Sequence, residues 1–355
     1  MARGHANVEE GDGSGTMHNN RRAILMSVGR ALYIAVLCPF AAAGANDQGL
    51  FHTTNQNPFI QIYTLPSPAP TPAPRVRAWA FSVAADVASN SILEENTALE
   101  RVVLDGETYR TTLSIAYSLS ERLTAELTLP FVAHSGGFMD ALIEDWHDLW
   151  GLSNDRRDDF VRNSLDFSYA EAGEDRFALR DRDRGLGDLR LSAEWRLRDA
   201  AKAQRSLAVR GGLKLPTGSA DALTGSGGTD VSLQFLSTDN ATFSAWNVTL
   251  AWMIGGLWLG EGDVLDDMRR DTVAIGSVGL SRPVWRNLIA RLQLDGHSAF
   301  YDSRLAPIGS GGLQVTFGGS IELARGGRID IAMMQNLATD AIPDLGLHLG
   351  WREAF

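Results

Sequence analysis

Downstream of Val76, apolar and polar residues alternate with a period of two, which is the repeat of a β-strand rather than of a helix. Residues 108–119 are the clearest example: Leu113 and Ile115 belong to a mainly apolar set of alternate positions, and Arg110 belongs to the polar set between them. The same alternation recurs in residues 189–197, 207–215 and 290–297. We therefore predict strands with one apolar and one polar face.

Twelve segments of this kind follow one another along the chain. Each spans nine to thirteen residues, which is longer than the ~5–6 residues of a typical globular strand. This length suits the ~9–11 tilted residues with which a strand crosses a bilayer. The segments begin near residues 76, 108, 123, 187, 206, 229, 243, 272, 286, 312, 327 and 343.

The connections between these segments alternate between short and long. Short connections lie near Ser120, Asp199, Ser237, Pro283 and Ala324, and long ones span residues 88–107, 134–187, 217–228, 260–271, 301–311 and 337–342. An outer-membrane barrel has this plan, with short periplasmic turns and longer extracellular loops. We predict an all-β fold, an antiparallel transmembrane β-barrel of about 12 strands over residues 76–355. A soluble β-sandwich is the alternative, with shorter strands and connections of similar length.

Aromatic residues fall near the predicted strand ends, where amphipathic rings favour the level of the lipid headgroups. Trp285 lies at the periplasmic level, and the last strand ends in Phe355, a signature read by the outer-membrane insertion machinery. We therefore expect lipid and this machinery as partners. The residues expected at the membrane interface are Trp79, Trp195, Trp246, Trp351 and Phe355 on the periplasmic side and Tyr109 and Tyr301 on the opposite side.

Residues 1–45 have the features of a secretory signal peptide. Arg21, Arg22 and Arg30 precede a short apolar stretch, and Ala43-Gly-Ala45 matches the A-x-A cleavage pattern. Residues 1–16 are acidic and Gly-rich, which points to Met17 as the start of translation. We therefore expect export to the bacterial outer membrane, with cleavage near Ala45.

Cleavage there would remove Cys38, the single cysteine, and leave 28 basic and 40 acidic residues. Catalytic cysteines, cysteine–zinc sites and disulfides are then excluded, and the acidic balance argues against nucleic acid as a partner. Residues 46–75 are predicted to form a periplasmic segment with a Pro-rich linker. Whether residues 46–63 plug the barrel is left open.

The polar faces of the predicted strands carry charges of both signs. Charges facing lipid would each cost ~2–4 kcal/mol near the midplane, so they must face the lumen. They could create a field across a water-filled channel, or pair across the lumen and close it. The expected lumen-lining residues are Arg110, Glu126, Asp188, Arg190, Glu194, Arg210, Lys214, Arg291, Asp295, His297, His348 and Arg352.

The long loops are strongly acidic. Residues 134–187 hold thirteen acidic residues against seven arginines, and residues 260–271 hold five against two. Such a mouth would attract cations over a range of about 8 Å. The longest loop is expected to fold inward, and it includes a cluster of Asp140, Glu144, Asp145 and Asp148 around Trp146 and Trp150. Its spacing matches no calcium loop, and the histidines match no zinc motif, so we predict no metal, cofactor or catalytic site.

Several segments resemble a family of Gram-negative outer-membrane proteins catalogued as a domain of unknown function. The resemblance covers essentially all of residues 46–355 and implies a barrel in the outer membrane, without an assigned activity or substrate. The segments that carry it are Asn55-Gln-Asn-Pro-Phe59, Gly185-Leu-Gly-Asp188, Leu213-Lys-Leu-Pro-Thr-Gly218, Gly225-Ser-Gly-Gly-Thr-Asp230, Leu294-Asp-Gly-His297 and residues 341–352 up to the terminal Phe355.

The sequence therefore favours a passive narrow diffusion channel or a substrate-selective uptake pore for an unknown small solute. Two alternatives stay open. One is an outer-membrane enzyme acting on lipid or envelope substrates, with His297 or His348 as the base, although no nucleophile shares their face of the sheet convincingly. The other is a structural or adhesion barrel with a plugged lumen.

Overall fold

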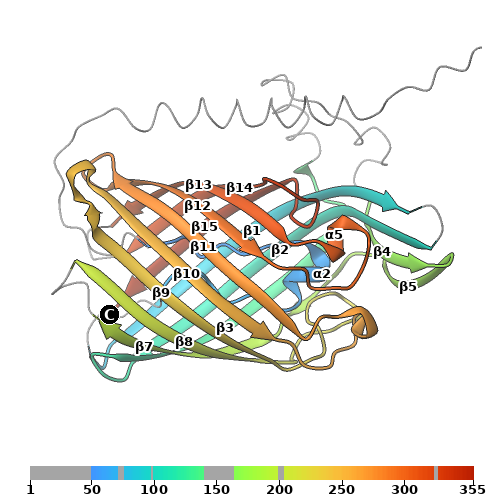
Figure 1. Cartoon of the computed structure of the whole chain (residues 1–355), viewed down its shortest axis with the longest axis horizontal. Coiled ribbons are helices and arrows are strands. Elements are labelled where there is room, and N and C mark those ends of the chain that lie inside the picture. The colour runs from blue at the N-terminus through green and yellow to red at the C-terminus, as the bar shows by residue number, and fades with distance from the viewer. Residues whose placement is uncertain (1–48, 71–75, 97–98, 140–163, 199–203, 324–326) are drawn as a thin grey trace, which may run out of the picture.

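The computed structural model describes residues 49–70, 76–96, 99–139, 164–198, 204–323 and 327–355. The predicted signal peptide and its cleavage near Ala45 lie outside the described residues. So does the acidic cluster predicted within residues 140–163. The described strands form a closed antiparallel barrel of twelve strands (Figure 1), which confirms the predicted fold class.

Each barrel strand pairs antiparallel with its neighbours, and the first strand pairs with the last from Ala80↔Ala354 to Ser89↔Leu345, which closes the barrel. Most strands begin within three residues of the predicted starts. The barrel strands are β1 (Trp79–Glu95), β2 (Glu100–Ser118), β3 (Leu123–Ser135), β7 (Leu189–Arg198), β8 (Arg205–Leu215), β9 (Asp230–Phe243), β10 (Val248–Trp258), β11 (Thr272–Pro283), β12 (Leu288–His297), β13 (Gly312–Glu322), β14 (Arg328–Asn336) and β15 (Leu345–Ala354).

The remaining elements are short. The connection between β3 and β7 carries β4 (Asp166–Glu171), β5 (Glu174–Leu179) and β6 (Asp183–Leu186). The helical turns are α2 (Pro58–Gln61), η2 (Ser244–Trp246), η3 (Asp266–Met268) and α5 (Ala306–Gly309). Among the described residues, no helix is long and apolar enough to cross a membrane.

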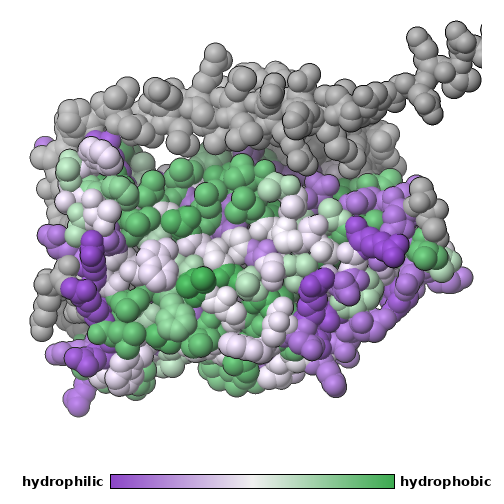
Figure 2. Space-filling view, viewed as in Figure 1, coloured by the Kyte–Doolittle hydropathy of each residue, from purple (hydrophilic) through white to green (hydrophobic). Residues whose placement is uncertain are grey.

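The two ends of the barrel differ (Figure 1). One end, here the turn end, carries the short connections and the C-terminus, and the other, the loop end, carries the long connections together with α2 and α5. Between them the outer face is apolar, and Figure 2 shows hydrophobic residues over the middle of the barrel with hydrophilic residues toward both ends. Leu233, Val278 and Ile331 are among these exposed residues.

The tryptophans lie where alternation placed them. Trp79, Trp195 and Trp351 are exposed near the turn-end termini of their strands, and Trp246 and Trp285 are exposed in turns at that end. The terminal Phe355 is exposed at the same end, and its ring lies 5.9 Å from that of Phe81. Tyr109 is half-buried beside Phe138 in the wall.

Tyr301 does not lie at the membrane interface, so that prediction was wrong. It is fully buried inside the loop end, where it forms an isolated bridge with Arg269. The residue follows β12 by four positions, and strand alternation no longer determines which way a side chain points in a connection. The connection between β12 and β13 turns inward over the lumen, so the Tyr301 ring is buried there.

The predicted loop 88–107 is instead an extension of the barrel wall. β1 and β2 stay paired from Trp79↔Tyr117 to Glu95↔Arg101, and β4 adds to the outer part of β2. Val102 and Leu104 belong to the loop-end core, and Val103 between them is buried as well, so residues 102–104 are consecutive buried apolar residues rather than an alternating set. For that reason alternation placed the start of β2 eight residues too late.

Candidate functional site

Residues 49–70 fill the lumen, and we call them the plug. The sequence placed residues 46–75 in the periplasm, whereas the described part of this segment lies inside the barrel. An ascending arm (residues 49–57) runs toward the loop end, α2 forms the tip, and a descending arm that begins at the last residue of α2 (residues 61–70) returns toward the turn end. The lumen-facing side chains of the strands hold both arms.

The ascending arm is bound along β12 and β13. Arg291 Nη1 donates to Gly49 O at 2.8 Å, and the Phe51 N–H donates to Gln293 Oε1 at 2.6 Å. Further along, the hydroxyls of Thr53 and Thr316 lie 3.5 Å apart, and both side chains are buried. The arm therefore runs beside two strands of the wall and is hydrogen-bonded to both.

The tip is anchored by asparagines and by an apolar core. Asn55 Nδ2 donates to Ala341 O at 2.9 Å, and Asn57 caps α2 by accepting from the Phe59 N–H at 3.0 Å. The side chains of Phe59 and Ile60 are fully buried in the loop-end core, together with residues of β2, β4, β10 and four long loops. This core closes the loop end from the inside.

Two tyrosines connect the tip to the loop after β12. Tyr63 donates its hydroxyl to Tyr301 at 3.0 Å, and Tyr301 donates to Phe59 O at 3.0 Å. Burial raises the pKa of Tyr301 well above its ordinary value, so its hydroxyl remains a donor at any physiological pH. Tyr301 thus fixes both sides of the tip.

The descending arm is held by three arginines. Arg110 Nη1 donates to Gln61 O at 3.1 Å, and Arg190 donates to Thr64 O from both Nε, at 2.9 Å, and Nη2. Arg210 donates to Ser67 O at 2.9 Å and to Ala69 O at 2.7 Å. The acceptors are mostly main-chain carbonyls, so this grip depends on the path of the arm more than on its side chains.

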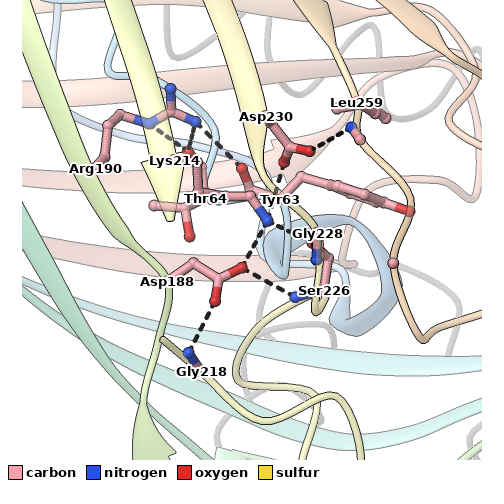
Figure 3. Close-up of polar contacts among 12 residues, drawn as sticks. Tyr63, Thr64, Asp188, Arg190, Lys214, Gly218, Ser226, Gly228, Asp230 and Leu259 are labelled. Atoms are coloured by element: carbon pink, nitrogen blue, oxygen red, sulfur yellow. Dashed lines mark hydrogen bonds and ion pairs between the residues drawn. The ribbon is translucent and has the colours of Figure 1, made fainter. Parts of the chain in front are cut away.

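Beside the descending arm, Lys214 is buried between two carboxylates (Figure 3). Its Nζ lies 2.6 Å from Asp188 Oδ2 and 3.0 Å from Asp230 Oδ2, and it also donates to Ser226. Asp188 accepts from the Gly218 N–H at 2.9 Å, which ties the loop after β8 to the wall. The ammonium also lies 5.8 Å from the ring centre of Tyr63.

The strand of the wall that contains Asp188 is interrupted between β6 and β7. β6 and β7 pair with the same strand, β3, in registers that differ by one residue. Pro130 of β3 lies opposite this interruption and has no N–H to donate. Its carbonyl accepts a hydrogen bond from the Gly187 N–H at 2.8 Å. Asp188 keeps the inward alternation of Arg190 in β7, and its carboxylate approaches Gly225 so closely that no side chain would fit on Gly225.

The segments that carry the family resemblance meet around the plug. Residues 185–188, 213–218 and 225–230 build the Asp188–Lys214–Asp230 network. Residues 55–59 form the tip, which contacts His297 and Ala341 of two further segments. These motifs therefore seat the plug, and alternation could not have revealed this because the plug has no period of its own.

The other expected lumen residues also point inward, in the wall around the plug. Glu194 pairs with Arg210 at 2.6 Å, and Asp295 accepts from Ser277 at 2.6 Å. Glu126 and Arg352 line a cavity of about 70 Å³ between the plug and the wall. Since one water needs about 10–15 Å³ of such volume, the cavity holds only a few waters.

His52 and Ser67 join the two arms of the plug across this cavity. Ser67 Oγ lies 3.0 Å from His52 Nδ1. Desolvation inside the lumen, followed by the nearby Arg328 charge, lowers the pKa of His52 to about 3, so the ring is neutral at physiological pH. The pair therefore adds a neutral hydrogen bond between the arms.

The two histidines considered as catalytic bases are both engaged in structural contacts. His297 Nδ1 donates to Ser298 O at 2.9 Å, so Nε2 accepts from Asn55 of the plug at 2.9 Å. His348 Nδ1 lies 2.7 Å from Asp86 Oδ1. Within the described residues, neither ring hydrogen-bonds a hydroxyl that could serve as a nucleophile.

Comparison with known proteins finds a matching family and solved structures with a similar barrel fold. A family model described as "Protein of unknown function (DUF3187)" matches residues 29–355, and no curated protein matches the chain in sequence. Among solved structures, the COG4313 outer membrane channel from Pseudomonas putida F1 is similar with a TM-score of 0.52 and 15% identity, over 80% of this chain and 97% of that one. The NanC porin has a TM-score of 0.43 and 10% identity, over 77% and 98%.

Proposed function

Since this chain belongs to the DUF3187 family of proteins of unknown function, we propose that it is an outer-membrane channel closed by its own N-terminal plug. Lipid surrounds the apolar belt of the barrel, and the insertion machinery recognises the terminal strand and Phe355. Transport is passive, driven by the gradient of a small solute. The plug must leave at least part of the lumen before the solute can pass.

The way the plug is held is the observation that carries this proposal. Its arms are bound mainly by hydrogen bonds from lumen side chains, including Arg190, Arg210 and Gln293, and they are not strands of the sheet. Removing an arm leaves the barrel ladder intact, because every barrel strand keeps both of its neighbours. A gated channel requires a barrel wall that stays intact when the plug leaves, and this barrel meets that requirement.

A reversible crosslink tests whether the plug closes the channel. In a chain whose Cys38 is replaced by Ala, Thr53→Cys with Thr316→Cys places two thiols where hydroxyls now lie 3.5 Å apart. We expect the oxidised protein in a planar bilayer to lack the conductance steps of the parent chain, and we expect reduction to restore them.

A matched crosslink within the wall is the control. The hydroxyls of Ser114 and Thr128 lie 3.1 Å apart on β2 and β3, which are already hydrogen-bonded neighbours. Oxidising the Ser114→Cys, Thr128→Cys variant should leave conductance unchanged. A folded parent chain that never conducts would refute the channel and favour a plugged structural barrel. Full conductance with the ascending arm locked would refute gating by that arm.

A further inference from the structure

Two buried arginines in the lumen bind only neutral groups. Arg110 donates to the main-chain and side-chain oxygens of Gln61 and to Thr112. Arg190 donates to the carbonyls of Tyr63 and Thr64 and to the hydroxyl of Ser232. Within the described part of the chain, no carboxylate lies in ion-pair contact with either guanidinium, and both residues are about 95% buried.

The carboxylates nearest to these arginines are already committed. Asp86, opposite Arg110 in the β1–β2 ladder, binds His348 at 2.7 Å. Asp188 and Asp230 both contact the single ammonium of Lys214, so the second of their two charges balances the nearby Arg190 through space, without touching it. A buried cation is ordinarily paired with an anion, since desolvating an unpaired charge is unfavourable. Because neither guanidinium has an anion among its hydrogen-bond partners, both can bind one directly.

The oxygen atoms of the descending arm mark where such an anion would bind. Arg190 uses Nε and Nη2 on Thr64 O, which is the edge of the guanidinium that grips a carboxylate or phosphate. Arg110 reaches the same arm nearer its tip and Arg210 nearer the turn end. The three side chains thus form a continuous track, the arginine track, along the path that the arm now occupies.

We propose that the transported solute carries an oxyanion group, a carboxylate or a phosphate, and that it replaces the descending arm on the arginine track of Arg110, Arg190 and Arg210. This inference rests on the proposed channel function. A guanidinium binds an ionised carboxylate or phosphate more strongly than a neutral carbonyl, because both partners are charged and two parallel hydrogen bonds can form. The solute therefore competes effectively with the plug carbonyls, and its binding favours the open channel.

The acidic loops do not reverse this selectivity. Their described residues, within 164–187 and 260–271, lie at the loop end, where water and salt screen charges beyond about 8 Å. The arginine track lies inside the barrel, where the low dielectric strengthens electrostatic interactions several-fold. Selection is therefore decided at the track, and the mouth mainly changes the rate at which anions arrive.

The test uses the full chain in a planar bilayer under a potassium chloride gradient, with citrate or inorganic phosphate then added to one side. We expect chloride to permeate better than potassium and at least one of the two oxyanions to reduce the current. Arg110→Gln and Arg190→Gln should each weaken that block about tenfold by removing a charge-assisted contact. The anion that blocks more strongly identifies a carboxylate or a phosphate as the preferred group.

Conservative and distant substitutions separate binding from folding. Arg190→Lys keeps the charge, so the reversal potential should stay near that of the parent while the block weakens. Arg205→Gln, at the exposed turn end of β8, should change neither. A channel that prefers potassium, or that neither anion blocks, would overturn the proposal while leaving the channel function in place.

A second measurement does not depend on conduction. Calorimetric titration of the detergent-solubilised full chain with citrate and with phosphate should show binding that Arg110→Gln or Arg190→Gln weakens about tenfold. If the bilayer recordings are silent, such binding still supports the arginine track while the channel function fails. Absence of binding by both anions to the folded protein would overturn the track.

Discussion

Lys214 is the residue on which most of the loop-end network depends. Its side chain is fully buried, and its ammonium contacts both Asp188 and Asp230. Lys214→Met keeps the length of the side chain but leaves two buried carboxylates without a cation, which should cost about 3–5 kcal/mol of unfolding free energy. Equilibrium denaturation in detergent micelles measures this loss.

The control for that substitution lies on the barrel surface. Arg205 pairs with Asp239 at 3.0 Å, but about half of its side chain is exposed. Arg205→Gln should therefore cost ~0–1 kcal/mol. Equal losses for the two variants would mean that the buried network adds nothing beyond an ordinary surface pair.

Alternation along a strand predicted the direction of single side chains but not their partners. Asp188, Lys214 and Asp230 each lie on the polar face at the loop end of a strand, so an inward orientation followed from the sequence. Their convergence depends on the cross-strand register, in which Lys214 lies opposite Asp230 and opposite Arg190, two residues from Asp188, and no period within one strand gives that register. Tyr301 shows the same limit, because it lies four residues beyond the end of β12.

At the scale of elements, the strands were predictable and the plug was not. Every barrel strand has an exposed apolar side on the outside and the lumen on the other side, so the sequence must alternate. The plug is surrounded by protein on all sides, and Phe59, Ile60 and Ile62 are all fully buried without any repeat. The available signal was composition, because the apolar cluster that follows Asn57 is unsuited to a solvated periplasmic segment.

Phe59 tests how firmly the tip is seated. Its fully buried ring meets Phe177 edge-on with ring centres 5.5 Å apart. Phe59→Ala removes this packing, which in a core typically costs ~3–5 kcal/mol, and here the loss falls on the plugged state alone. We expect more frequent and longer openings in single-channel recordings, and a lower free energy of unfolding because the folded protein is plugged.

An exposed phenylalanine provides the comparison for Phe59. Phe235 lies on the outer face of β9 and is 43% exposed. Phe235→Ala should leave the opening frequency at the parent value, since the Phe235 side chain points out of the barrel, away from the plug. If Phe59→Ala also leaves openings unchanged, the tip does not limit release of the plug.

The whole molecule combines an exterior suited to lipid with an interior that binds its own N-terminal segment. Large apolar side chains are exposed around the middle of the barrel, while the inward side chains are charged or polar and mostly satisfied. Ordinary soluble proteins do not expose so continuous an apolar belt. We therefore predict that lipid surrounds this belt, and this prediction can be tested separately from the gating of the lumen.

Val278 lies near the middle of β11 on the outer face and is 42% exposed. If lipid surrounds the belt, Val278→Arg places a cation near the bilayer midplane and should lower the free energy of unfolding from vesicles by about 2–4 kcal/mol. Thr272→Arg, at the loop end of the same strand and near the headgroups, should cost only ~0–1 kcal/mol. The difference between the two losses of unfolding free energy measures the effect of the membrane, because in water an exposed arginine would be tolerated equally at both positions.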